Sequence, residues 1–108
     1  YLVDDVIVGL VYFHIITGCA AQFHPYILRE FKDKYDDMVQ EFFEWFISTE
    51  QSVITKLNVV IPEICKGALE AADRARMTVE GVDRNSFLTE DGPCGRIMLG
   101  ITRKELTE

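Results

Sequence analysis

The chain has 108 residues, of which 48% are hydrophobic and 11% aromatic, and its formal net charge is −7. This length and composition predict one domain, residues 1–108, with a hydrophobic core, and they exclude a disordered tail. The acidic charge argues against a nucleic-acid partner, because such binding depends on Lys and Arg neutralising phosphates.

The first element expected is a helix over residues 2–23, because residues 6–23 (VIVGLVYFHIITGCAAQF) contain no charged side chain. A run of 18 residues is just within the usual length range of a membrane-spanning helix. His14 lies near its middle, however, and Asp4 precedes it where a signal peptide would carry positive charge. The run therefore favours the buried central helix of a bundle over a membrane anchor, which stays the alternative.

A second helix is expected over residues 25–47, starting at Pro25. Apolar side chains recur there at helical spacing, and charged side chains occupy the other positions. The apolar positions are Ile27, Phe31, Tyr35, Met38, Phe42 and Trp45. The acidic side chains of this segment are interpreted as a solvated face.

A third helix is expected over residues 50–77, with a start signal in which Gln51 follows Ser48 at capping-box spacing. Its apolar positions alternate in steps of three and four, and Pro62 does not disturb that phase, which predicts a kink there. The glycine-rich segment 78–108 is expected to be irregular or a short hairpin. The fold class predicted is thus mainly α, a small bundle of three main helices.

Four aromatic residues in five positions form the best candidate for contact with a partner or ligand, because they cover more than half of a helix circumference. They are Phe42, Phe43, Trp45 and Phe46. The alternative is that all four are buried between helices.

Two further side chains are candidates for chemistry. His14 could be the polar anchor of an apolar pocket, and Cys94 could be a reactive thiol because it lies in a turn beside Arg96. A cysteine nucleophile also needs a histidine base, and the sequence offers only His14 and His24. His14, Cys19 and His24 are five residues apart, which does not suit metal ligands on one helix face, so no metal and no cofactor are expected.

The three cysteines are widely spaced and lack a CxxC pair, which indicates reduced thiols in a cytoplasmic protein. The sequence contains no Ser-His-Asp set, P-loop or HExxH motif. We therefore expect a non-enzymatic helical protein-protein interaction or regulatory module, acting as a homodimer or with another protein. The alternative is a helical bundle that binds a small apolar molecule or lipid between its first two helices. A membrane-anchored domain and a thiol enzyme using Cys94 come third and fourth.

Overall fold

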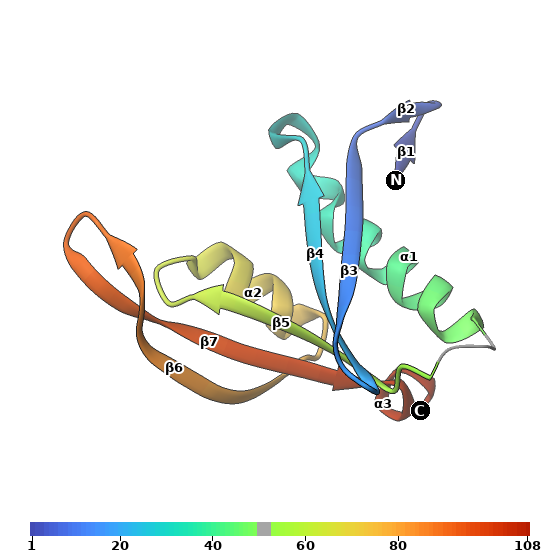
Figure 1. Cartoon of the computed structure of the whole chain (residues 1–108). Coiled ribbons are helices and arrows are strands. Elements are labelled where there is room, and N and C mark those ends of the chain that lie inside the picture. The colour runs from blue at the N-terminus through green and yellow to red at the C-terminus, as the bar shows by residue number, and fades with distance from the viewer. Residues whose placement is uncertain (50–52) are drawn as a thin grey trace.

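The computed structural model describes residues 1–49 and 53–108, and Figure 1 shows a mixed sheet with two longer helices. Five strands hydrogen-bond in the order β3-β4-β5-β7-β6. A separate ribbon of β1 (Leu2–Val3) and β2 (Val6–Ile7) precedes them. β4 and β5 run parallel, whereas the other neighbouring pairs of the five-stranded sheet are antiparallel. The fold is therefore α/β, and the prediction of a mainly α helical bundle is wrong.

The uncharged run at residues 6–23 forms strands and not the expected helix. β3 (Gly9–Thr17) and β4 (Ala20–Ile27) pair antiparallel across a short turn. The run is rich in β-branched and aromatic side chains, which favour strands. Because both faces of β3 are apolar, the run lacks the alternation that separates a strand from a buried helix.

The second expected helix is confirmed over most of its length. A 3₁₀ helix, η1 (Arg29–Lys34), leads into α1 (Tyr35–Ser48). The buried residues of α1 are Met38, Val39, Phe43 and Phe46, which lie on one stripe at helical spacing. Its predicted start was wrong, because Pro25 lies inside β4. No helix within residues 1–49 and 53–108 is long and apolar enough to cross a membrane.

The third expected helix is instead a strand followed by a shorter helix, β5 (Lys56–Pro62) and α2 (Lys66–Arg74). Leu57 and Ile61 are four residues apart, a spacing that puts two side chains on one face of a helix and equally of a strand. Pro62 ends β5 and does not kink a helix. The expected helix start at residues 50–52, with Gln51, lies outside the described residues.

The C-terminal segment is a long hairpin. β6 (Thr78–Thr89) and β7 (Gly92–Thr102) pair antiparallel, and a short helix, α3 (Arg103–Thr107), follows. Gly92 has φ +105°, a conformation that glycine adopts without strain, and it closes the turn. The hairpin expected here is therefore present, but it spans nearly the whole segment.

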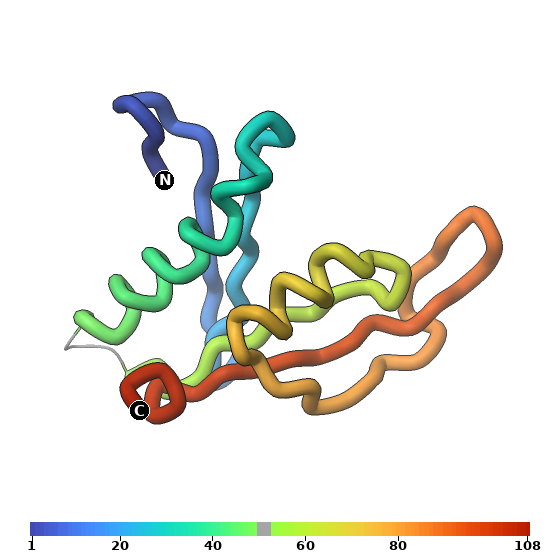
Figure 2. The backbone as a smooth tube through the Cα atoms, turned by 180° about the vertical axis from the view of Figure 1, so that it is seen from behind, coloured from blue at the N-terminus to red at the C-terminus, as the bar shows by residue number. Residues whose placement is uncertain are grey.

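Helices α1 and α2 both cover one face of the sheet, as the two opposite views in Figures 1 and 2 show. Alternate residues of the central strands point toward them, including Phe23, Leu57 and Leu99, and these are buried in the core. The opposite face carries exposed apolar side chains such as Tyr12 and Met98. The core thus lies between one layer of helices and one sheet.

Strands β4 and β5 separate soon after they pair. Ala20–Gln22 pairs with Lys56–Asn58, and beyond this short register the two strands diverge (Figure 1). α1 follows β4 and α2 follows β5, so both helices begin near the open ends of these strands. This divergence positions the candidate site.

Candidate functional site

A cleft of about 620 Å³ opens between α1 and α2, at the carboxyl ends of the diverging strands β4 and β5. Ligands of open α/β sheets bind at the carboxyl ends of strands, in the crevice left by such a divergence. We call it the strand cleft, and it is lined by Pro25, Lys32, Asp33, Tyr35, Gly67, Ala68, Ala71 and Arg74.

The inner end of the strand cleft is apolar and narrow. It continues into a cavity of about 20 Å³ whose lining includes Phe23 of β4, Val59 of β5 and Met77. The side of this space formed by α2 carries only small side chains, including Ala68 and Ala71. Because alanine leaves room that a larger side chain would fill, the cleft can admit the aliphatic part of a ligand.

The mouth of the strand cleft is charged. Arg74 of α2 reaches Asp36 of α1, and its Nε and Nη2 atoms lie 2.8 and 3.2 Å from the two carboxylate oxygens. The hydrogen bond to Asp36 raises the pKa of Arg74. Lys32 adds a second cation to the lining, and the first turn of α1 carries Asp36 and Asp37. The positive end of the α1 dipole therefore lies at the mouth but is partly offset by these aspartates.

Tyr35 supplies the phenol of the strand cleft. Burial, and to a smaller extent the charge of Asp36, raise the pKa of Tyr35. The hydroxyl group therefore stays protonated at neutral pH and can donate a hydrogen bond to a ligand.

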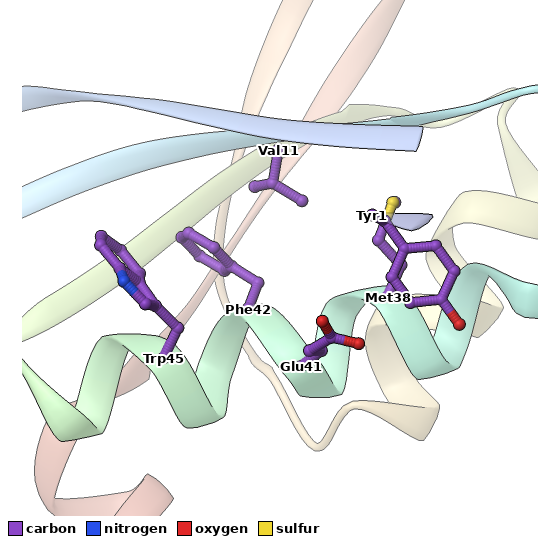
Figure 3. Close-up of a pocket in the computed structure, with 6 residues that line it drawn as sticks. All are labelled: Tyr1, Val11, Met38, Glu41, Phe42 and Trp45. Atoms are coloured by element: carbon purple, nitrogen blue, oxygen red, sulfur yellow. The ribbon is translucent and has the colours of Figure 1, made fainter. Parts of the chain in front are cut away.

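The four aromatic residues singled out in the sequence divide into two pairs. Phe43 and Phe46, 2% and 3% exposed, lie in the core. Phe42 and Trp45 point from α1 toward β3, where they line a hollow of about 260 Å³ (Figure 3). We call it the aromatic hollow, and it is lined by Tyr1, Val11, Met38, Glu41, Phe42 and Trp45. Contact of these aromatics with a partner or ligand stays a prediction.

His14 and His24 lie on neighbouring strands, β3 and β4, and their ring centroids are 5.1 Å apart. His24 also stacks on Tyr12 at 4.6 Å. Burial, followed by the charge of His14, lowers the pKa of His24. The helical pocket that His14 was expected to anchor does not exist, since its segment is a strand.

Cys94 lies near the start of β7, and its thiol is 3.5 Å from the carbonyl oxygen of Gly95. The guanidinium of Arg96 is bound to Asp83 and Ser86. It is therefore already engaged elsewhere, and an unusual reactivity of Cys94 stays a prediction. Within residues 1–49 and 53–108, no three His, Cys, Asp or Glu side chains come together as metal ligands could.

Solved structures share the fold of this chain, but no relative is found by sequence. No protein-family model and no curated protein matches the sequence. Among solved structures, a chimera of the spermidine N-acetyltransferase SpeG from Vibrio cholerae with hSSAT matches with a TM-score of 0.85 at 14% identity. GNAT-family acetyltransferases from Bacillus anthracis and Streptococcus pneumoniae match with TM-scores of 0.79 and 0.77, both at 11% identity. The chain has the fold of these acetyltransferases.

The coverage of these matches is unequal. The likeness covers 97% of this chain but only 64% of the SpeG chimera, and 94% of this chain but 62% of the other two acetyltransferases. The chain thus spans less than two thirds of the length of these neighbours.

The likeness also corrects the functional prediction. A helical interaction or regulatory module was inferred from an excess of apolar helical surface, and that surface is a β-hairpin of the sheet. The alternative, a ligand pocket between the first two helices of a bundle, fails for the same reason. Both predictions are wrong, whereas homodimer formation stays untested.

The strand cleft was not predicted from the sequence. Ala68, Ala71 and Ala75 belong to the segment expected to form the third helix, and they border a cavity. The signal that could have revealed the cleft is the β-branched composition of Lys56–Pro62 directly before this alanine-rich helix. That order suggests a strand followed by a helix, as in a βα unit.

Proposed function

We propose that the chain is the donor-binding part of an N-acyltransferase, which moves an acyl group from a thioester such as acetyl-CoA to a primary amine. The observation that carries this proposal is the strand cleft, a space with an apolar inner end and a charged mouth at the carboxyl ends of diverging parallel strands, in a chain with the acetyltransferase fold. A ligand bound there would meet backbone from β4 and side chains from both helices.

The residues present fit the aliphatic arm of an acyl thioester. Pro25, Tyr35 and the alanines of α2 offer apolar contacts, and the Tyr35 hydroxyl can donate a hydrogen bond. The phosphates of the donor would lie toward Lys32 and the start of α1, where a helix N-terminus favours anions. Asp36 and Asp37 oppose that attraction, so we expect modest affinity for the donor.

A cationic amine suits the charge of this chain as the acyl acceptor. The net charge of −7 raises the local concentration of cations and lowers that of anions. Spermidine, the substrate printed in the name of one structural neighbour, is a reasonable first acceptor to test.

The test is calorimetric titration with acetyl-CoA. Ala68→Trp fills the strand cleft and should weaken donor binding by about tenfold or more, equivalent to roughly 1.4 kcal/mol. Glu70→Trp adds the same side chain to the same helix, outside the lining, and should leave the affinity unchanged. Mass spectrometry of spermidine incubated with wild-type protein and acetyl-CoA then checks for transfer. Equal affinities in the two variants, or no binding to the wild type, would overturn the proposal.

A further inference from the structure

The aromatic hollow is a second candidate site, separate from the strand cleft. It lies between α1 and β3, and its lining shares no residue with that cleft. Phe42 and Trp45 stack with ring centroids 5.9 Å apart and an interplanar angle of 28°. Phe13 of β3 contacts both rings, at 5.9 Å from each. Three rings from two elements therefore hold one another in place beside the hollow.

Two of the three rings remain accessible, whereas Phe42 is partly buried against the core. Trp45 is 51% exposed, and Phe13 is also exposed. Val11 and the side chain of Met38 complete an apolar wall. Large aromatic side chains left at a surface around a concavity mark contact with a ligand rather than core packing.

Glu41 gives the hollow its charge. Figure 3 shows its carboxylate pointing into the space between Phe42 and Tyr1. Within residues 1–49 and 53–108, no ion pair joins Glu41 to another side chain. The backbone nitrogen of Tyr1 donates to the carbonyl oxygen of Gly9 at 2.9 Å. The carboxylate is thus available to a ligand.

We propose that the aromatic hollow binds an organic cation with a primary ammonium head and a short aliphatic body. The carboxylate of Glu41 receives the ammonium group, and the half-exposed ring of Trp45 attracts the same charge through cation–π interaction. The aliphatic body lies against Val11 and Met38. A neutral or anionic ligand would leave the carboxylate without a partner.

This inference does not rest on the proposed acyl transfer. Helix α1 stands between the hollow and the strand cleft, because Tyr35 and Phe42 lie on it and line the two spaces separately. The hollow is thus an accessory cation site, and it can be present whether or not the strand cleft binds a thioester.

The experiment uses the intrinsic fluorescence of Trp45, the single tryptophan of the chain. The wild-type protein is titrated with n-butylammonium chloride. A reference titration with sodium chloride follows the same increase in ionic strength. We expect a saturable change in Trp45 fluorescence with a Kd on the order of 1 mM, because exposed cation–π and ion-pair contacts are individually weak. Butan-1-ol, the neutral counterpart of nearly the same shape, should bind about fivefold more weakly or not at all.

Two matched variants separate the site from general attraction to an acidic protein. Glu41→Gln should weaken butylammonium binding by about fivefold, the scale of an exposed ion pair. Glu44→Gln removes the same charge three residues along α1, outside the lining, and should change binding by less than about twofold at physiological salt. Equal losses in both variants, equal binding of butan-1-ol, or no saturable change in the wild type would each overturn the proposal.

Discussion

Leu57→Ala tests the packing that holds the two helices on the sheet. Leu57 lies in β5, the strand on which the divergence depends, and its exposed fraction is 0%. Truncation removes three carbons, about 2.4 kcal/mol at roughly 0.8 kcal/mol for each methylene. The cavity left behind adds to this loss, since buried Leu→Ala changes cost about 3–5 kcal/mol in total. We therefore expect the free energy of unfolding to fall by about 3–5 kcal/mol.

The assay is urea unfolding followed by circular dichroism, with Leu88→Ala as the matched control. Leu88 is 80% exposed on β6, and its truncation should cost less than about 0.5 kcal/mol. The thermal midpoint should also fall by at least about 12 °C in Leu57→Ala, at roughly 4 °C for each kcal/mol. A loss below about 1 kcal/mol, or equal losses in both variants, would refute the placement of β5 at the centre of the core.

Three further predictions concern other parts of the fold. A Cβ at Gly9 would lie 2.6 Å from a core methionine sulfur, so Gly9→Ala should lower the unfolding free energy by about 1–3 kcal/mol. A Cβ at Gly18 would meet no other atom within 4 Å, so Gly18→Ala should lower the unfolding free energy far less. Equal urea midpoints for the two variants would contradict this prediction. The Arg103 guanidinium donates to two backbone carbonyls at 2.9 and 3.1 Å, so Arg103→Met should cost about 1–3 kcal/mol in the same assay, and an unchanged midpoint would count against these bonds. Because the pKa of His24 is lowered in the folded state, the unfolded chain binds its proton at higher pH, and stability should fall as pH drops below 6.5. His24→Gln should flatten that dependence, and an unchanged pH profile would contradict the pKa shift.

The sequence predicted α1 well because its pattern is unambiguous. Charged and apolar side chains alternate at helical spacing over several turns. Of the apolar positions expected to face the core, Met38 is buried, but Trp45 is exposed, and the buried stripe includes Phe43 and Phe46. The same pattern led to the aromatic cluster, although it could not show that Phe42 and Trp45 would meet β3.

The strands were wrongly predicted as helices for two physical reasons. Residues 6–23 are apolar on both faces, so no period distinguished a strand from a buried helix. In β5, Leu57 and Ile61 are separated by four residues, a spacing common to both structures. The strand cleft could not be predicted because it depends on where two parallel strands part, a tertiary property that local sequence does not carry.

Chemical-shift mapping with acetyl-CoA by nuclear magnetic resonance is the most direct test of donor binding in the strand cleft. We expect the backbone amide shifts to concentrate at residues 26–35 and 67–74, which border the strand cleft on its two sides. Shifts spread over the surface, shifts centred on the aromatic hollow, or no shifts at millimolar acetyl-CoA would contradict the assignment of the strand cleft as the site of the acyl donor.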